Sequence, residues 1–544
     1  MDRVMDRVMD LVVTADRIRT FADPDLGPTA IGIRRGRIAA LGTREDIAEW
    51  RGSATQVIDL GDATVTPGLI DAHVHPVLGA QLTRGAALLG LDLPGVRRAL
   101  AEEAATIEPG GWVLGWGLDP NVVHGRPLTA ADIDDVVGPR PALIRLFDGH
   151  SALASSEALL VAGVDGPRAF DQRSEVVCDA GARPTGLLLE AAAIALVDAA
   201  VPEASVEEIA ARAHGALSGM AALGITAAHA LEHAPEASAV YGLIEAEGEL
   251  PVRLRCSPWV QPGTDEEDWA AVAQLQGTGG RRWYVRGAKL FIDGTVDNGT
   301  AWLAEPDTLG ESTSPYWPDP AAYARAIAWL DEHDVPTTSH AIGDQGVRHV
   351  LHALAGTGGR LRHRIEHIET IPDDLVEAFA RLPITASMQP THCTEYVAPD
   401  HSDNWSTRLG PVRAGRGWRI ADLRSAGVRV ALGSDWPIAD FDPRGILAAA
   451  QLRRRGGAPD RAPICPEQAI SARMALEGYT THAAWSVGED DVAGTLEVGK
   501  RADLTAFAVD PLVAPPDELV EAPIVLTVVD GAVSHRAAQV GADA

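Results

Sequence analysis

Lysine is almost absent from this chain of 544 residues. Its 46 basic residues include only two lysines, Lys289 and Lys500, and every other one is arginine. Arginine keeps its charge at any ordinary pH, whereas a buried lysine can lose its proton and act as a neutral amine. Amine chemistry is therefore excluded from nearly the whole chain, and each remaining lysine is a candidate for a role that arginine cannot fill.

Three further features of the composition exclude classes of protein. Only four cysteines occur, and none has the spacing of a metal knuckle, so we expect free thiols in a reducing cytoplasm. Acidic residues number 76, and the net charge of −30 argues against nucleic-acid and anionic-membrane partners. No apolar run is long enough to cross a bilayer, and Met1–Met9 has no apolar signal core. We expect a cytoplasmic protein that acts on a small molecule; its own assembly is open, with a homodimer as one alternative.

The middle of the chain alternates strand-like and helix-like patterns. The helical patterns include Ser205–Leu223, Ala321–His333 and Pro372–Arg381. The apolar, strand-like runs number eight: Val65–Ala72, Ile225–Ala230, Val252–Val260, Val285–Ile292, Pro336–Ile342, Arg364–Ile368, Ile384–Gln389 and Val428–Gly433. Eight strands with helices between them predict an α/β fold, a (β/α)8 TIM barrel over residues 67–484.

Two regions fall outside this pattern. The stretch from about 91 to 200 is too long for one connection between a strand and a helix, so we expect an inserted subdomain there. Both chain ends show short strands joined by turns such as Arg35-Gly36 and Asp530-Gly531. Residues 1–66 and 485–544 are thus predicted to form one small composite β-sandwich domain, with two unrelated β extensions as the alternative.

Side chains that bind metals gather at the predicted strand ends. His73 and His75 end the first strand, where residues i and i+2 point to the same side. Later strands carry a lysine, two histidines and an aspartate, namely Lys289, His340, His367 and Asp435. Barrel enzymes place their chemistry at the carboxyl ends of the strands. Each residue alone has an ordinary structural explanation, but the whole set would then need several coincidences.

Lys289 lies inside an apolar strand, in Val285-Arg-Gly-Ala-Lys289-Leu-Phe-Ile292. A buried lysine has a lowered pKa, and its neutral amine can capture carbon dioxide as a carbamate. A carbamate is a carboxylate able to bridge two metal ions, and guanidinium cannot form one. Chance survival of this lysine is the alternative, since Lys500 persists elsewhere, where we expect a structural role.

The motifs around these residues resemble one known family. Besides the order His-x-His, Lys, His, His, Asp, they include His340-Ala-Ile-Gly-Asp344, Arg364-Ile-Glu-His367 and Gly433-Ser-Asp435. They resemble the amidohydrolase superfamily, and within it the amidohydrolase 3 group, which includes N-substituted formamide deformylases. The likeness covers nearly the whole chain. One departure follows Lys289, where the group usually carries an arginine that Asp293-Gly-Thr-Val-Asp-Asn-Gly-Thr300 lacks.

This resemblance implies a metal-dependent hydrolase of carbon–nitrogen bonds other than peptide bonds, with N-acyl or N-formyl amines as substrates. It implies two divalent metal ions, one on His73, His75 and Asp435, the other on His340 and His367. Carboxylated Lys289 would bridge them, a metal-bound hydroxide would attack, and Asp435 would carry the proton to the departing amine. Zinc suits these ligands, while iron, manganese, nickel and a mononuclear site stay open.

Three more residues, His150, His229 and Trp436, are candidates for contacting substrate or supporting the ligands, with ordinary structural roles as the alternative. A deaminase or an ester or lactone hydrolase could use the same site. His363-Arg-Ile-Glu-His367 also matches the inverzincin pattern of zinc peptidases, which requires a helix. A barrel that binds metal without catalysis is a further alternative.

Overall fold

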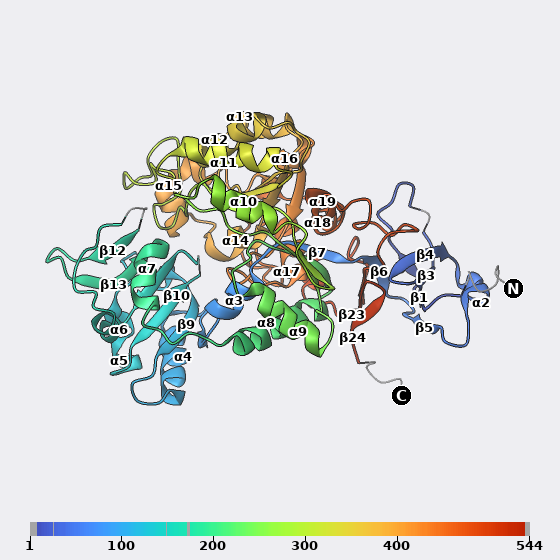
Figure 1. The fold of residues 1–544 in the computed structure, drawn as a ribbon, viewed down its shortest axis with the longest axis horizontal. Coiled ribbons are helices and arrows are strands. Elements are labelled where there is room, and N and C mark those ends of the chain that lie inside the picture. The colour runs from blue at the N-terminus through green and yellow to red at the C-terminus, as the bar shows by residue number, and fades with distance from the viewer. Residues whose placement is uncertain (1–7, 26, 124, 148, 171–173, 539–544) are drawn as a thin grey trace.

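The computed structural model describes residues 8–25, 27–123, 125–147, 149–170 and 174–538 (Figure 1). Met1–Met9, where we expect no apolar signal core, lies largely outside these residues. The last six residues of the predicted C-terminal segment lie outside them too. Among the described helices, none combines the length and apolar character that a membrane span requires.

Eight parallel strands form the centre of the molecule. They are β7 (Leu69–Val74), β14 (Ile225–Ala230), β15 (Arg253–Cys256), β17 (Ala288–Phe291), β18 (Thr337–Ala341), β19 (Arg364–His367), β20 (Thr385–Met388) and β21 (Arg429–Leu432). β7, β14 and β15 pair in one sheet, whose edge is the short parallel strand β16 (Trp283–Val285), and β17 to β21 pair in another. Parallel bridges between Val74 and Trp436 and between Trp259 and Lys289 join the two sheets into a closed ring. The predicted α/β barrel is therefore confirmed.

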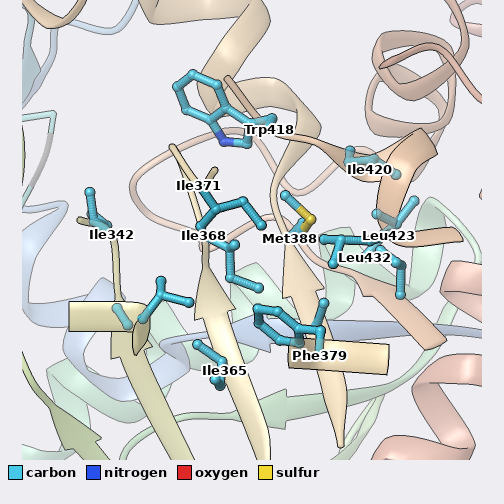
Figure 2. Packing of buried hydrophobic residues seen from close by; sticks show 14 of the residues in the cluster. Ile342, Ile365, Ile368, Ile371, Phe379, Met388, Trp418, Ile420, Leu423 and Leu432 are labelled. Carbon is cyan, nitrogen blue, oxygen red and sulfur yellow. The ribbon is translucent and has the colours of Figure 1, made fainter. Parts of the chain in front are cut away.

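Both faces of these strands are buried, as expected for a parallel sheet covered by helices. Around β19 and β20, Ile365 and Met388 pack toward Phe379 of helix α13 (Asp373–Ala380) and Leu423 of helix α16 (Ile420–Ser425) (Figure 2). The helices begin where the sequence supplies caps: Ser205 and Glu208 form a capping box at the start of α8 (Val206–Ala222). The main barrel helices are α8 (Val206–Ala222), α9 (Ala237–Glu247), α10 (Glu266–Gln274), α11 (Pro320–Glu332), α12 (Asp344–Ala355), α13 (Asp373–Ala380), α16 (Ile420–Ser425), α17 (Pro443–Leu452), α18 (Ala472–Tyr479) and α19 (Thr481–Ser486).

A separate six-stranded sheet lies between β7 and α8 in the chain and beside the barrel in space (Figure 1). Its strands are β8 (Ala86–Ala87), β9 (Val113–Leu118), β10 (Ala142–Leu146), β11 (Ser151–Ala154), β12 (Glu175–Cys178) and β13 (Pro184–Leu189). Helices α4 (Leu93–Thr106), α5 (Asp134–Val137), α6 (Ser156–Val161) and α7 (Glu190–Asp198) accompany it. Two buried clusters of its own give this region a core distinct from that of the barrel.

Two small sheets lie at the other end of the molecule, where both chain ends meet (Figure 1). The first contains β1 (Leu11–Thr14), β3 (Ala30–Arg34), β4 (Arg37–Gly42) and β5 (Gln56–Asp59). The second contains β2 (Arg17–Ile18), β6 (Thr64–Pro67), β22 (Leu504–Phe507), β23 (Ile524–Val529) and β24 (Ala532–Arg536). Asp530 and Gly531 both have positive φ, as the tight hairpin between β23 and β24 requires. One buried cluster takes residues from both sheets.

Candidate metal centre

A single cavity at the carboxyl ends of the barrel strands is lined by all six predicted metal ligands. Its volume is ≈ 190 Å³. His73 is the last residue but one of β7, and His75 directly follows that strand. Lys289 lies in β17, His340 in β18, His367 at the end of β19, and Asp435 three residues after β21. Residues that are 362 positions apart in the chain thus face the same space.

Asp435 is the centre of this group. The Nε2 atoms of His73 and His75 each lie 3.2 Å from its Oδ1 atom, and Nδ1 of His367 lies 3.8 Å from Oδ2. Ligand atoms of His73, His367 and Asp435 all lie within 4.8 Å of one another, a span that one metal ion can fill. This trio combines residues of both predicted metal sites. His73 and Asp435 are predicted ligands of one metal ion, and His367 is a predicted ligand of the other.

The donor set fits a divalent transition-metal ion. Among the described residues, His73 Nε2 and His367 Nδ1 are buried without a hydrogen-bond partner. Leaving such atoms unpaired is costly unless something absent from the polypeptide satisfies them. Burial, more than any charge, holds the pKa values of His73, His340 and His367 well below the usual range. These imidazoles are therefore neutral, which is the form that binds a metal.

Asp435 is ionised in the same environment. Burial opposes its ionisation, but the surrounding imidazoles, among them His75 through a hydrogen bond, outweigh burial and lower the pKa of the carboxyl group. Asp435 and His367 also adopt positive φ angles, 59° and 71°. A left-handed conformation costs a residue other than glycine roughly 1 kcal/mol or more, and such strain gathers at functional sites.

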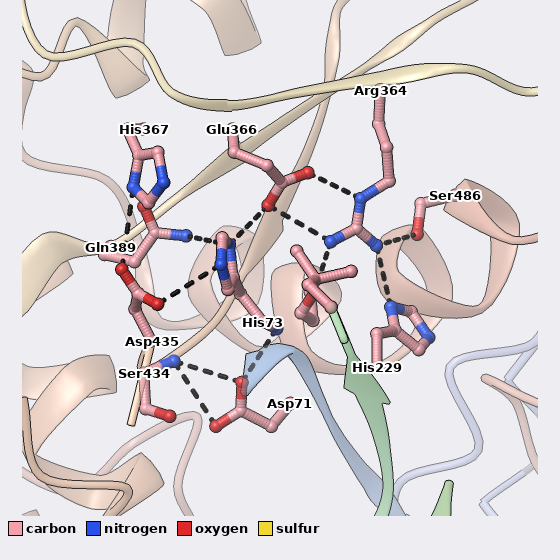
Figure 3. A network of polar contacts seen from close by, with 12 residues as sticks. Asp71, His73, His229, Arg364, Glu366, His367, Gln389, Ser434, Asp435 and Ser486 are labelled. Carbon is pink, nitrogen blue, oxygen red and sulfur yellow. Dashed lines mark hydrogen bonds and ion pairs between the residues drawn. The ribbon is translucent and has the colours of Figure 1, made fainter. Parts of the chain in front are cut away.

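A chain of charged groups holds His73 from behind (Figure 3). Its Nδ1 atom lies 2.7 Å from Oε2 of Glu366, and Nε of Arg364 donates to Oε1 of Glu366 at 2.6 Å. Arg364 in turn contacts Nδ1 of His229 at 2.8 Å. Glu366 keeps the proton of His73 on Nδ1, which leaves Nε2 free to face the cavity.

Asp71 connects the first and last barrel strands behind the ligands. Its carboxylate accepts hydrogen bonds from the backbone of His73 and of Ser434, each at 3.0 Å, and burial raises its pKa to about 7. The backbone of Asp435 donates to the carbonyl of His73 at 2.7 Å. Together these bonds set the spacing between the histidine pair and the aspartate.

His340 and Lys289 form the other side of the cavity. Nε2 of His340 lies 3.2 Å from the carbonyl oxygen of Gly294 and 3.8 Å from Asp293, whose carboxylate accepts three backbone hydrogen bonds. Lys289 is only 1% exposed, and burial lowers its pKa to about 8. Its Nζ atom lies 4.9 Å from the centre of the Phe291 ring and has no hydrogen bond or ion pair to any described residue.

The three further candidates take different places. His150 lines the cavity, with Nδ1 2.9 Å from Oε2 of Glu190. His229 lies behind the ligands, bonded to Arg364. Trp436 is not among the residues that line the cavity: its ring packs over Gly79, where a Cβ atom would come within 2.2 Å of it, and its carbonyl accepts the backbone N–H of His75.

Sequence reasoning missed several residues of the cavity wall, among them Glu190, His392 and Glu369. His392 lies 3.8 Å from Oδ2 of Asp435 and follows β20, a strand to which no candidate had been assigned. A polar residue just past that strand was a usable signal. Glu369 accepts a hydrogen bond from Trp405, and burial raises its pKa to about 8. Glu190 comes from the six-stranded region, and no local pattern connects it to the barrel.

The peptidase alternative fails on local structure. Arg364–His367 is strand β19, so His363 and His367 cannot share the face of a helix. His363 lies at the opposite end of the strand, where Nδ1 accepts the N–H of Thr337 and Nε2 lies 3.0 Å from Asp331.

Comparison with known proteins gives a consistent result. The model of a family described as the amidohydrolase family matches residues 56–535. The chain is 29% identical over 527 residues to Protein LONG AFTER FAR-RED 3 of Arabidopsis thaliana, covering 92% of this chain and 87% of that protein. It is 24% identical over 552 residues to the N-substituted formamide deformylase of Arthrobacter pascens, covering 98% of this chain and 99% of that one.

Solved structures share the fold. An uncharacterized metal-dependent hydrolase from Pyrococcus horikoshii OT3 has a TM-score of 0.71 at 22% identity, covering 93% of this chain and 99% of that one. The atrazine chlorohydrolase TrzN from Arthrobacter aurescens TC1, complexed with zinc, has a TM-score of 0.53 at 18% identity, covering 96% and 94%. At these identities the likeness is one of fold.

Proposed function

Since the chain belongs to the amidohydrolase family and is a metal-dependent hydrolase of carbon–nitrogen bonds, we propose that it cleaves N-acyl or N-formyl amines in the cavity around Asp435. The observation that carries this proposal is a pair of buried nitrogens beside the Asp435 carboxylate, His73 Nε2 and His367 Nδ1, which no described residue engages in a hydrogen bond. The similarity to a formamide deformylase supports the substrate class.

Two divalent metal ions would be held by His73, His75, His340, His367 and Asp435. When bound, they would supply Lewis acidity, which polarises the scissile carbonyl and activates a water molecule for attack. Zinc agrees with the imidazole-rich donor set and with the zinc complex of a structural neighbour.

Lys289 would join them as a carbamate. Its pKa of about 8 leaves part of the amine uncharged at neutral pH, and no described residue donates to or accepts from Nζ. The amine nitrogen forms a bond to the carbon of carbon dioxide and releases one proton. The product carries a negative charge on two oxygens in place of the ammonium, so it can bind two cations where a lysine would repel them.

Asp435 would serve as the proton carrier. Its carboxylate is ionised, lies 3.2 Å from two imidazoles and lines the cavity, so it can accept a proton from the attacking water. It would then deliver that proton to the nitrogen that leaves. Glu366 and Arg364 would hold His73 in place during both transfers.

The cavity wall suits an amine that carries an apolar group. Aromatic rings line it, among them Phe147 and Tyr396, stacked at 3.8 Å, and Trp259 and Phe291 in edge contact at 5.2 Å. Glu190 brings a buried carboxylate whose Oε1 atom has no partner among the described residues. An N–H group of the substrate would satisfy that oxygen. We propose that residues 91–200 act as an insertion in the 67–484 barrel that supplies this wall, and that 1–66 and 485–544 form a separate β-sandwich domain.

The test is metal analysis of the purified protein followed by hydrolysis assays on a panel of N-acyl amines, cyclic aminopyrimidines, esters and lactones. We expect two metal ions per chain and cleavage of N-acyl or N-formyl amines that stops in Asp435→Asn. Asp374→Asn, which removes a surface carboxylate paired with Arg348, is the control. Turnover confined to aminopyrimidines or to esters would overturn the substrate class, and loaded metal without turnover on any member would favour a binding barrel.

A further inference from the structure

A second cavity lies at the amino-terminal ends of the barrel strands, opposite the metal centre. Pro67 and Gly68, just before β7, line it together with Arg253 and Arg255 of β15. Segments that follow the barrel close it, including Glu489, Arg501 and Asp503. Its volume is ≈ 20 Å³, so it is far smaller than the cavity of the metal centre.

Arg255 is the unusual residue of this cavity. It is 5% exposed, its Nε atom is buried without a hydrogen-bond partner, and no hydrogen bond or ion pair joins its guanidinium to any residue that the structure describes. Residues 253 and 255 point to the same side of β15. Yet Arg253 has a carboxylate partner, Asp503 at 2.6 Å, and Arg255 has none.

The carboxylates nearby are already engaged. Glu489 pairs with Arg501 at 2.5 Å and accepts the hydroxyl of Tyr284. On the neighbouring side, Arg364 pairs with Glu366 at 2.6 Å (Figure 3). Among the described arginines that line this cavity, Arg255 is the one that has no carboxylate within ion-pairing distance.

A buried unpaired charge is one of the most unfavourable groups that a protein interior can hold. Burial lowers the pKa of Arg255 to about 10, so the guanidinium stays charged at neutral pH and cannot relieve the cost by losing its proton. Something other than the polypeptide must therefore supply the missing acceptor or the missing negative charge.

We propose that this cavity binds one small monovalent anion of about the size of chloride, held against the guanidinium of Arg255. A cavity needs a volume of roughly 10–15 Å³ to hold one water molecule. This cavity therefore has room for one ion of about that size and excludes phosphate or an organic carboxylate. The anion would connect Arg255 of the barrel with the segment from Glu489 to Asp503 that leads into the terminal sheets. Its role would be structural, and it is independent of the substrate.

The direct test uses bromide, which replaces chloride and is located by its anomalous scattering. Crystals of the full-length, metal-loaded protein are soaked in sodium bromide. We expect an anomalous peak in this cavity within hydrogen-bonding distance of the Arg255 guanidinium. Density there without anomalous signal would mean a water molecule and would overturn the proposal, as would an empty cavity.

The second test measures thermal unfolding in sodium chloride and in sodium gluconate at equal ionic strength. Because binding to the folded state alone stabilises it, chloride should raise the unfolding temperature along a saturable curve. Arg255→Met should abolish that rise, since the variant has no charge to compensate. Arg325→Met, which removes an exposed arginine paired with Asp319, should keep it. A chloride response that persists in Arg255→Met would also contradict the proposal, and the bromide experiment decides the matter if that variant fails to fold.

Discussion

Oε2 of Glu366 lies 2.7 Å from Nδ1 of His73, although 293 positions of the chain separate the two residues. The carboxylate comes from β19 and the imidazole from β7, and both side chains are fully buried in the barrel interior. The pair decides which nitrogen of His73 faces the metal centre. It therefore connects the packing of the barrel to the chemistry at its carboxyl end.

Glu366→Gln should weaken metal binding without unfolding the barrel. The amide keeps the shape of the carboxylate but loses its charge, so it holds the His73 proton less firmly, and Arg364 loses its ionic partner. Loss of such a supporting group costs roughly 10–100-fold in metal affinity. Competition with a chelator of known affinity measures the change. Glu377→Gln, an exposed residue of α13, should leave affinity unchanged; equal affinity in both variants would show that Glu366 does not orient His73.

The two lysines of the chain provide a matched pair of variants. Lys289→Arg should lose the second metal ion and reduce activity by more than the roughly 10–100-fold expected for a supporting residue, because guanidinium forms no carbamate. Lys500→Arg should retain the second metal ion and the activity, since Lys500 makes ordinary polar contacts with Glu497 and Thr495. Metal content and turnover, with and without added bicarbonate, are the measurements. A Lys289→Arg enzyme with two metals and full turnover would rule out the carbamate.

The barrel could be predicted because its signals are local. Each strand is a short apolar run, and each candidate ligand stands at or near the end of one, so no knowledge of distant contacts was needed. The ligand assignment itself stays a prediction. The contact between Glu190 and His150 could not be foreseen, since it depends on the pairing of β11 with β13 inside the six-stranded region. Similarly, Arg255 looks like any strand arginine until the partners of Arg253 and Arg501 are known.

His363→Asn should affect stability and leave metal binding intact. His363 is 1% exposed, and its two nitrogens bond to Thr337 and Asp331, so the variant loses a buried hydrogen bond worth about 1–3 kcal/mol. Chemical denaturation measures the loss in the free energy of unfolding. His367→Asn is the comparison, and there we expect metal content to fall. Loss of metal in His363→Asn would indicate that His363 is a metal ligand, as the zinc-peptidase pattern requires.

His482 should make the protein less stable in acid. Burial first, and Arg424 second, lower its pKa from 6.5 to about 4 in the folded state. The unfolded chain therefore binds a proton at His482 more readily than the folded protein does. The contribution of neutral His482 to the free energy of unfolding is complete above pH 6.5 and is lost as the pH falls toward 4. The effect is at most on the order of 3 kcal/mol. His482→Gln should therefore flatten the dependence of unfolding free energy on pH in this window, and an unchanged slope would contradict the assignment.

Glu190→Gln should weaken the capture of substrates that carry an N–H group. Glu190 is 4% exposed and has a φ of 64°, so its carboxylate is held rigidly in a strained backbone beside the cavity. A charged hydrogen bond contributes about 1.5–3 kcal/mol, which corresponds to roughly 10–100-fold in kcat/KM. We expect most of this loss in KM for secondary amides, and little for tertiary amides that have no N–H to donate. Metal content should stay constant, which separates this effect from damage to the metal centre. Equal losses for secondary and tertiary amides would show that Glu190 supports the fold through His150 and does not contact the substrate.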